Sequence, residues 1–496
     1  MTSTAQCAPT HLRSPVSRLP LETLAFILCH VCRSDLLRIS TTSRAWRASA
    51  RFDQRFFLCA NIRVRTPKRR NNDDNSLVIQ LARSSSIIRY AWRHSIRVHL
   101  SLQVNKKAYR FAASLDGIEL AIPAFIALWT AARTFISSLR ITVDADRLAL
   151  LERELRGRAP RLYSLRVTNM SRPKLSLSDA FFADGTPNLR VLNLDNVLPG
   201  QQVLIPAFRR VRSANVTISD RASLQDMRIR TILPSIKSLE LHIHTGLECT
   251  ETFSELLDGT QLDTLLIYGA PRLAFGSTYC LQIKHISYII EEPLDWRRFL
   301  MRPETSGNMW SFFPSCGTSG AAVGLDVLRG PSSAHSASSF HPREHENSLV
   351  LVVYEPLTGM TRRLSLRHPD GGLRHNAWPL VAISIQTIRT RLTSITVCPE
   401  TVWGLPEVGE MPALGRLVVQ LRDDWLDSRG LLIACQTGGV IDAPALTSVA
   451  LSSATATKVR RVSTDMFREL AKMIGLGGHD APHVSFQLHD VKIFKL

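Results

Sequence analysis

Pro187-Asn-Leu-Arg-Val-Leu-Asn-Leu194 is the stretch that decides the fold, because its leucine pattern returns along the chain. Leu189, Leu192 and Leu194 are spaced L-x-x-L-x-L, and a proline stands two residues before the first leucine. With aliphatic substitutes, the pattern occurs at Ile136/Leu139/Ile141, Leu162/Leu165/Val167, Leu189/Leu192/Leu194, Val211/Ala214/Val216, Ile236/Leu239/Leu241, Leu262/Leu265/Ile267, Leu392/Ile395/Val397, Leu414/Leu417/Val419 and Leu446/Val449/Leu451.

The spacing of these copies indicates a repeat architecture. The first six begin 22 to 27 residues apart. Alternating aliphatic residues favour a short strand, and a proline before it ends any preceding helix and admits extended backbone. A period of this length is typical of leucine-rich repeats, in which each unit supplies one parallel strand and a returning helix or loop. Chance copies in another kind of α/β protein would not keep this near-constant spacing.

We therefore expect an α/β fold with a solenoid of parallel strands plus helices over residues 111–300, continuing in 348–496. The asparagine or cysteine that usually closes each repeat is replaced, for example by Met170, Val197 and His244, so the solenoid should be irregular. Residues 301–347 are rich in Ser, Gly, Pro and His, which predicts a disordered insertion. Residues 348–366 then read as strand, turn and strand, a hairpin expected at the edge of the repeats.

Composition places the chain among intracellular globular proteins. The hydrophobic fraction is 45% and nine cysteines are irregularly spaced, which favours free thiols over a disulfide framework. The start of the chain lacks the apolar stretch of a secretory signal. The longest apolar run, 118–132, is interrupted by Glu119 and Pro123 and is short for a membrane span. We expect no membrane association, and a cytoplasmic or nuclear location.

The formal net charge of +19 is concentrated near the N-terminal end. Residues 1–70 carry thirteen Lys and Arg against three acidic residues, Glu22, Asp35 and Asp53. Such a basic region favours an acidic partner, which could be protein or nucleic acid. Residues 59–110 are expected to form a basic linker and the first strands, and 1–16 to be disordered.

Residues 17–58 predict a small module of three short helices. Pro20 suits a first helical turn, and an apolar stripe of Leu21, Leu24, Leu28 and Val31 follows it. Ser34 or Asp35 can cap a second helix, and Ile39, Ser43, Trp46 and Ala50 mark a third. So small a core is marginal alone and gains stability by packing on another protein.

The motif Leu19-Pro20-x-Glu22-x-Leu24-x-x-Ile27-Leu28, followed by Asp35-Leu36-Leu37-x-Ile39 and Ser43-x-x-Trp46-Arg47, resembles the F-box consensus. Thr42 replaces the usual valine, and Cys29-His30-Val31-Cys32 replaces the common end of the first helix. With irregular repeats behind it, the layout is similar to F-box proteins abundant in mushroom-forming fungi. The resemblance implies binding to a Skp-type adaptor and, through it, a cullin. The residues implied in forming this surface or holding its helices together are Leu19, Pro20, Leu24, Ile27, Leu28, Leu36, Leu37 and Trp46.

Three other motifs suggest chemistry but fit a plain structural role better. His341-Pro342-Arg343-Glu344-His345 matches a zinc-peptidase pattern, yet Pro342 and Ser-rich flanks argue against the helix that it needs. Cys29-x-x-Cys32 lacks a second ligand pair. Lys68-Arg69-Arg70 could be a nuclear-import signal or phosphate-contacting patch, but a solvated basic linker is the favoured interpretation. We expect no catalytic residues, metal site or cofactor.

The combined interpretation is a non-enzymatic substrate-recognition subunit of an SCF-type ubiquitin ligase, with an unknown protein target held by the repeats. Two alternatives stay open. One is a basic nucleic-acid-binding scaffold, which is disfavoured because no aromatic residues are interleaved with the basic run for base stacking. The other is an interaction module that keeps the F-box pattern yet joins no ligase.

Overall fold

The fold is described from a computed structural model of the chain. The structure describes residues 19–20, 23–24, 27–28, 31, 39, 46, 58–64, 74–94, 97–105, 112–171, 175–178, 181–182, 185–198, 205–218, 229–243, 257, 259–269, 283–290, 316, 321–329, 348–367, 383, 386–402, 404–421, 439–453, 460–475, 484–489 and 491–494. Residues 1–16, expected to be disordered, lie outside this set. The chain divides into two compact units, and each is treated by itself.

Unit 1 comprises Met1–Asn193 and Ile205–Arg210. Its strands are β1 (Leu58–Val64), β2 (Val98–Val104), β3 (Ile136–Val143), β4 (Ser164–Asn169), β5 (Leu175–Ser176) and the first part of β6 (Val191–Asp195). Its helices are α4 (Asp74–His94), α5 (Ala112–Ala132), α6 (Ala145–Glu154) and the 3-10 turn η3 (Pro206–Phe208). Helix α4 lies where the sequence predicts a basic linker, so that part of the 59–110 prediction is wrong.

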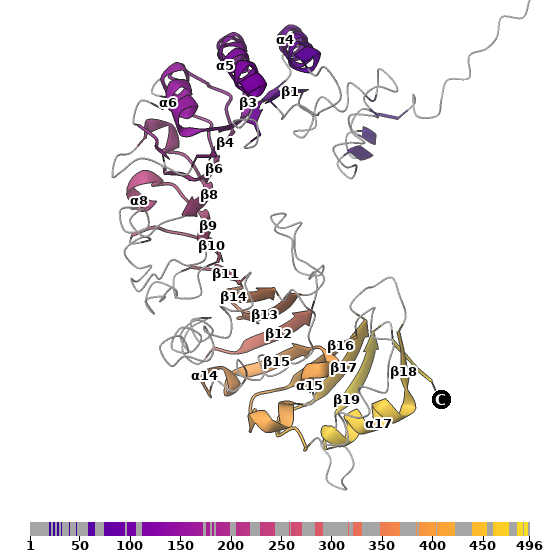
Figure 1. The fold of residues 1–496 in the computed structure, drawn as a ribbon. Coiled ribbons are helices and arrows are strands. Elements are labelled where there is room, and N and C mark those ends of the chain that lie inside the picture. Colours follow the sequence, from indigo (N-terminus) through magenta and orange to yellow (C-terminus); the bar gives the residue numbers. More distant parts are fainter. Residues whose placement is uncertain are drawn as a thin grey trace, which may run out of the picture. The chain divides into compact units, whose positions relative to one another are not determined.

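Strands β1 to β4 form a parallel sheet whose aliphatic residues are in register. Leu102 pairs with Ile141, and Ile141 pairs with Val167. All three are fully buried. Helices α4, α5 and α6 lie on one side of these strands (Figure 1). The buried aliphatic rows therefore face the helices, and the residues between them, which alternate to the other face, form the open face of the sheet.

Helix α5 is long and apolar enough to cross a membrane by length and composition alone. One side of it is nevertheless buried within unit 1, through Ile118, Ala121, Phe125 and Trp129. Glu119 is exposed and pairs with Arg147 of α6 at 3.1 Å. This arrangement is that of a helix with one face packed inside unit 1.

Four aromatic rings close the core of unit 1. Trp129 meets Phe182 edge to face with ring centroids 5.5 Å apart, and Phe181 meets Phe182 at 4.6 Å. Phe181 also contacts Phe208 of η3 at 6.4 Å. All four side chains are at most 1% exposed. Three of these aromatic residues, Phe181, Phe182 and Phe208, come from the segments that follow β4 and β6, and Trp129 comes from α5.

Unit 2 comprises Leu194–Leu204 and Val211–Leu496. Its strands are β7 (Val197–Leu198), β8 (Ser213–Ile218), β9 (Ser238–Ile243), β10 (Thr264–Tyr268), β11 (His285–Ile290), β12 (Val323–Arg329), β13 (Ser348–Tyr354), β14 (Thr361–Arg367), β15 (Leu392–Val397), β16 (Arg416–Leu421), β17 (Ser448–Ser453), β18 (Arg460–Ser463), β19 (Ser485–His489) and β20 (Val491–Phe494). Its helices are α8 (Ile229–Ile232), α14 (Gln386–Arg389), α15 (Pro399–Val402), η5 (Leu405–Val408) and α17 (Thr464–Met473).

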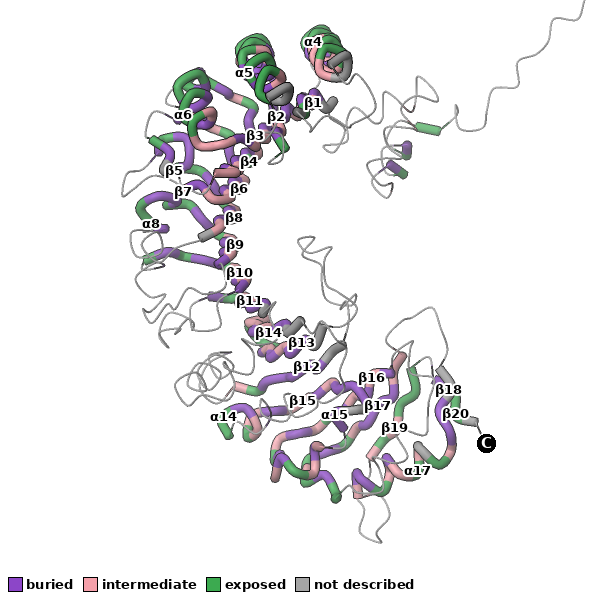
Figure 2. Tube along the Cα trace, in the orientation of Figure 1, coloured by how far each residue is buried: buried purple, intermediate pink, exposed green. Residues whose placement is uncertain are grey.

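The main sheet of unit 2 runs in the order β8-β9-β10-β11-β14-β13-β12-β15-β16-β17-β19. It is parallel except at the two pairs made by β13. The aliphatic positions of successive copies pair directly, as Leu239 with Leu265 and Leu417 with Val449 do. Figure 2 shows buried segments along the strands of this unit. The predicted mixed α/β fold with a large, mostly parallel sheet is confirmed.

A proline-containing turn leads into several of these strands. The N–H of Leu189 donates to the carbonyl of Thr186 at 3.0 Å, which places Pro187 at the second position of the turn. The N–H of Leu414 donates to Met411 around Pro412 at 3.1 Å in the same way. Proline suits this position because its fixed φ matches the turn. Where such a proline precedes a strand, it therefore forms part of the turn that leads into that strand.

The hairpin prediction is confirmed in its pairing and wrong in its place. Strands β13 and β14 are antiparallel and in register from Ser348 with Arg367 to Tyr354 with Thr361. However, β14 also pairs with β11 and β13 with β12, so the hairpin lies inside the sheet. Its outer partner β12 comes from residues 301–347, and the predicted disorder is therefore wrong for 323–329. The Ser-rich composition of that segment hides Val323, Leu325 and Val327, which are fully buried.

Candidate functional site

The predicted adaptor-binding residues begin with a short helix after Pro20. The N–H of Leu24 donates to the carbonyl of Pro20 at 3.1 Å, which is the i to i+4 bond of a first helical turn. Thr23, Leu24, Ile27 and Leu28 are helical. Proline is favoured here because its missing N–H would have no partner inside the helix.

The apolar residues at the start of this module differ in their exposure. Leu24 and Leu28, four residues apart, are 1% and 0% exposed. Leu19 and Ile27 are each 39% exposed, and Pro20 is exposed beside them. Leu19, Pro20 and Ile27 are therefore accessible apolar residues beside the buried pair. We call these three residues the exposed stripe.

Leu28 is the centre of a small hydrophobic cluster. Ile39 and Trp46 pack against it, and both are half-buried and helical. Residues 11 and 18 positions further along the chain therefore meet the first helical stretch at Leu28. Leu36 and Leu37 lie outside the described residues, as do Cys29, Cys32 and the basic run 68–70.

The structure sorts the predicted site residues into two groups. Leu24, Leu28 and Trp46 belong to the interior of the module, where they hold its segments together. Leu19, Pro20 and Ile27 are accessible to a partner. Both roles are implied by the consensus, and among the described site residues Leu19, Pro20 and Ile27 are the most accessible.

Comparison with known families identifies this region. Residues 16–58 match the F-box domain. No curated protein matches the chain. The chain therefore carries an F-box domain at 16–58, and its remaining residues are understood from their own structure.

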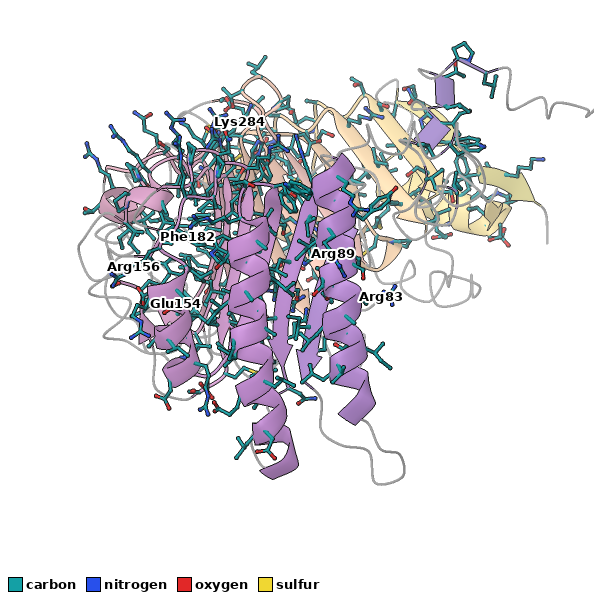
Figure 3. All side chains as sticks on the ribbon, turned by 90° about the horizontal axis from the view of Figure 1, so that it is seen from above. Arg83, Arg89, Glu154, Arg156, Phe182 and Lys284 are labelled. Carbon is teal, nitrogen blue, oxygen red and sulfur yellow. The ribbon has the colours of Figure 1, made fainter. Side chains whose placement is uncertain are left out.

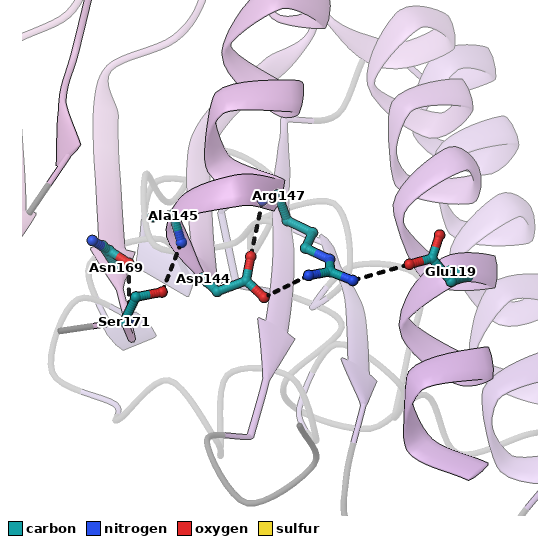
Figure 4. A network of polar contacts seen from close by, with 6 residues as sticks. All are labelled: Glu119, Asp144, Ala145, Arg147, Asn169 and Ser171. Carbon is teal, nitrogen blue, oxygen red and sulfur yellow. Dashed lines mark hydrogen bonds and ion pairs between the residues drawn. The ribbon is translucent and has the colours of Figure 1, made fainter. Parts of the chain in front are cut away.

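A polar network fixes the start of α6 on the sheet of unit 1 (Figure 4). Asp144 caps the helix by accepting from the N–H of Arg147 at 2.9 Å. The Arg147 guanidinium bridges Asp144 at 3.2 Å and Glu119 of α5 at 3.1 Å. The N–H of Ala145 donates to Ser171 Oγ at 2.9 Å. These contacts are those of a capped helix end and carry no chemistry of their own.

Asn169 closes the turn after β4, a role that the sequence did not suggest. Its side chain is 3% exposed and accepts from the N–H of Ser171 at 2.9 Å. The leucine-rich consensus places an asparagine one residue later, at Met170. A search that allowed the position to shift by one would have found it.

Within the described residues, no group of three or more His, Cys, Asp or Glu side chains could hold a metal ion. The His341–His345 motif lies outside those residues. Among the described cysteines, Cys316 and Cys398 are buried and form no disulfide. Burial raises the pKa of the Cys316 thiol to about 11, which disfavours the nucleophilic thiolate.

The open face of the unit 1 sheet carries three arginines that the sequence analysis did not single out. Arg63 of β1 and Arg166 of β4 are exposed, and Arg140 of β3 is half-buried between the aliphatic rows. The signal was present in the residues between the repeating leucines, as in Leu139-Arg140-Ile141 and Leu165-Arg166-Val167. Only the strand register shows that Arg140 and Arg166 lie side by side.

Proposed function

We propose that this protein is the substrate-recognition subunit of an SCF-type cullin-RING ubiquitin ligase. F-box domains in general bind a Skp-type adaptor, and the chain carries such a domain at 16–58. The observation that carries the proposal is the exposed stripe of Leu19, Pro20 and Ile27 above the buried Leu24 and Leu28. Burying an apolar side chain contributes at most about 1.5–3 kcal/mol before entropic costs, so a few such residues can anchor the adaptor.

In this role the chain performs no catalysis itself. It holds a protein target near a ubiquitin-loaded enzyme that the adaptor and cullin bring, and the rate gain comes from proximity. We accordingly propose a non-enzymatic protein without cofactor or metal. We also propose a cytoplasmic or nuclear location without membrane association, which the packed face of α5 supports.

We further propose that the strands behind the F-box are degenerate leucine-rich repeats of the kind abundant in F-box proteins of mushroom-forming fungi, and that they hold the target. Three features support this assignment: the recurring L-x-x-L-x-L pattern, the direct pairing of equivalent aliphatic residues, and the proline turn before several strands. The interior hairpin of β13 and β14 departs from a regular repeat.

Co-purification with a Skp-type adaptor tests the proposal. The double variant Leu19→Ala/Pro20→Ala, and separately Ile27→Ala, should weaken adaptor capture while the circular dichroism spectrum stays unchanged. Leu115→Ala on α5 is a matched control, because Leu115 is 38% exposed and Leu19 is 39% exposed. Unchanged capture by the stripe variants, or equal loss in the control, would count against the F-box contact.

A ubiquitin-transfer assay separates a ligase subunit from a module that only binds the adaptor. The full chain is combined with adaptor, cullin and RING protein, and ubiquitin conjugation is followed on the chain and on proteins that co-purify with it. Conjugation that depends on the exposed stripe supports the ligase role. Adaptor binding without any conjugation would favour the non-ligase interaction module.

A further inference from the structure

Helix α4 carries the most exposed large apolar side chains of unit 1. Among the described residues of this unit, the three highest exposures of such side chains are Trp92 at 70%, Ile79 at 62% and Val78 at 58%. The opposite side of the helix is ordinary core, where Ile88 and Ala91 are buried and the helix packs against β1 and α5. Single exposed apolar residues are common on protein surfaces, whereas three on one helix point to a contact surface.

Arginines lie between these apolar residues. Arg83, Arg89 and Arg93 are exposed, and Figure 3 shows Arg83 and Arg89 on α4. Between Leu77 and Arg93 the helix contains no Asp or Glu. Among the described residues, no carboxylate forms an ion pair with any of the three arginines. The apolar residues and the arginines together are called the outer face of α4, which comprises Val78, Ile79, Arg83, Arg89, Trp92 and Arg93.

The positions on this side of α4 follow the spacing of a helix–helix contact. Successive members of the row are +4, +3, +4 and +3 apart, at Val78, Ala82, Ser85, Arg89 and Trp92. The row is about 21 Å long. Val78 and Trp92 at its ends are large, whereas Ala82 and Ser85 in its middle are small. Because small side chains let a second helix approach closely, the row can receive another helix that lies along α4.

The charge of the outer face decides the chemistry of that second helix. Three arginines without a paired carboxylate attract a surface that carries Asp or Glu, and contacts between arginine and carboxylate are charge-assisted and often bidentate. A second copy of α4 would place arginine against arginine, and like charges oppose such pairing. An anionic membrane surface is also disfavoured, because an interfacial helix buries a continuous apolar face and this row is interrupted by Ser85 and Arg89.

We propose that the outer face of α4 binds an acidic amphipathic helix of a partner protein. The apolar residues of that helix pack against Val78, Ile79 and Trp92, and its Asp and Glu side chains pair with the three arginines. The outer face lies outside residues 16–58 and shares no residue with the exposed stripe, so the proposal does not rest on the ligase role. A failure of adaptor binding would leave the outer face standing, and the reverse also holds.

Binding of a designed peptide to the full chain tests the proposal. The probe is a fluorescent peptide of three heptads with Leu at positions a and d and Glu at positions e and g, because the glutamates disfavour pairing of the peptide with itself. A second peptide has Lys in place of each Glu. In fluorescence anisotropy at low salt, the glutamate peptide should bind at least about tenfold more tightly than the lysine peptide. No binding of the glutamate peptide, or equal binding of both, would overturn the proposal.

Variants of the chain locate the binding on α4. Ile79→Ser/Trp92→Ser should weaken the affinity for the glutamate peptide about tenfold or more through lost apolar contact. The matched control is Leu120→Ser/Leu150→Ser, because Leu120 on α5 is 50% exposed and Leu150 on α6 is 43% exposed. This control should bind the peptide as the wild type does. Equal loss in the two double variants, or no loss in either, would contradict the outer face as the site.

A second pair of variants measures the contribution of charge. Arg83→Gln/Arg89→Gln should weaken binding of the glutamate peptide about fivefold at 50 mM NaCl and less at 500 mM, since salt screens exposed charges. The control Arg153→Gln/Arg156→Gln removes two exposed arginines at the end of α6 and should leave the affinity unchanged. A control that loses as much affinity as the α4 variant would show that only the net charge of the chain matters, which would overturn the proposal.

Two further measurements examine the other occupants of this face. Co-sedimentation with phosphatidylserine vesicles tests a membrane surface, and sedimentation equilibrium of the chain alone tests a second copy. Vesicle binding or a dimer that Ile79→Ser/Trp92→Ser abolishes would overturn the acidic helix as the occupant. Every variant should keep the wild-type midpoint of urea unfolding, because each substituted side chain is exposed. Should Ile79→Ser/Trp92→Ser unfold, the loss in Arg83→Gln/Arg89→Gln decides the proposal alone.

Discussion

At the scale of single residues, Cys316 makes the stability of unit 2 depend on pH above about 9. Its thiol is fully buried and lies 3.4 Å from the carbonyl of Met360, at the turn between β13 and β14. Burial, which outweighs the neighbouring charge of Arg362, raises its pKa from the ordinary 9.0 to about 11. Below pH 9 the thiol is protonated in both folded and unfolded chains, and it adds no pH dependence.

Between pH 9 and 11 the unfolded thiol loses its proton and the folded one keeps it, so stability falls as pH rises. We expect a loss of about 2 kcal/mol from this group between pH 8 and pH 10.5. The free energy of unfolding in urea measures it. Burial also raises the pKa of Tyr354, and this has the same effect on stability. The comparison is therefore with Cys316→Ala, whose loss of stability between pH 8 and pH 10.5 should be smaller by about 2 kcal/mol. Identical slopes would contradict the raised pKa.

Phe182 is the residue on which the aromatic core of unit 1 depends. Its ring contacts both Trp129 and Phe181, and its backbone is in the left-handed region at φ +53°. Phe182→Ala should lower the free energy of unfolding by about 3–5 kcal/mol through lost burial and a residual cavity. Tyr163→Ala, at a side chain that is 54% exposed, should stay within about 0.5 kcal/mol of the wild type. Urea unfolding of both variants would show this difference.

At the scale of elements, the hairpin of β13 and β14 introduces antiparallel pairing into an otherwise parallel sheet. Its turn places Gly359 at φ +67°, and the Gly359 N–H donates to the backbone carbonyl of Glu355 at 2.9 Å. A Cβ at Gly359 would meet Lys284 only at ordinary contact distance, so a substitution strains the backbone alone.

Gly359→Ala should therefore cost about 1–2 kcal/mol, the price of the left-handed conformation for a residue with a Cβ. Leu357→Ala in the same turn should have almost no effect, because Leu357 is 89% exposed. Hydrogen exchange of the amides in β13 and β14 offers the most direct measurement, since faster exchange should be confined to the glycine variant. Equal exchange in both variants would show that the turn does not limit the hairpin.

The elements also show how far the sequence could predict the fold. The repeated aliphatic positions led to parallel strands, because leucines two apart read directly as one buried face. Helix α4 was missed because its apolar residues do not follow one clear helical period. Three serines, Ser84 to Ser86, interrupt its middle, and two large apolar residues, Val78 and Trp92, are exposed. Its packing against α5 and β1 favours a helix that propensity alone does not.

Strand β12, the exposed stripe and the Arg140–Arg166 pair show what the sequence could not predict. Strand β12 was hidden because a composition average over 301–347 outweighed seven residues of clear alternation. The F-box motif named the apolar residues of the first helix, but only the burial of Leu24 and Leu28 separated them from the exposed Leu19 and Ile27. The Arg140–Arg166 pair depends on a strand register that no local pattern contains.

At the scale of the whole molecule, the formal charge of +19 makes two kinds of partner distinguishable by salt. An adaptor held by the exposed stripe is bound mainly through apolar burial, which ionic strength changes little. Nucleic acid would be bound through phosphates, and a protein making six to ten such contacts loses roughly 10³–10⁵ in affinity between 50 and 200 mM salt.

We therefore expect adaptor capture to change less than about threefold between 50 and 200 mM NaCl, and any affinity for a random DNA duplex to fall by the far larger factor. Fluorescence anisotropy with labelled duplex, and calorimetry with the adaptor, measure the two on one preparation. Leu19→Ala/Pro20→Ala should weaken only adaptor capture and leave duplex binding unchanged. A duplex affinity that persisted at 200 mM salt would revive the nucleic-acid scaffold, since a retained affinity requires contacts beyond charge.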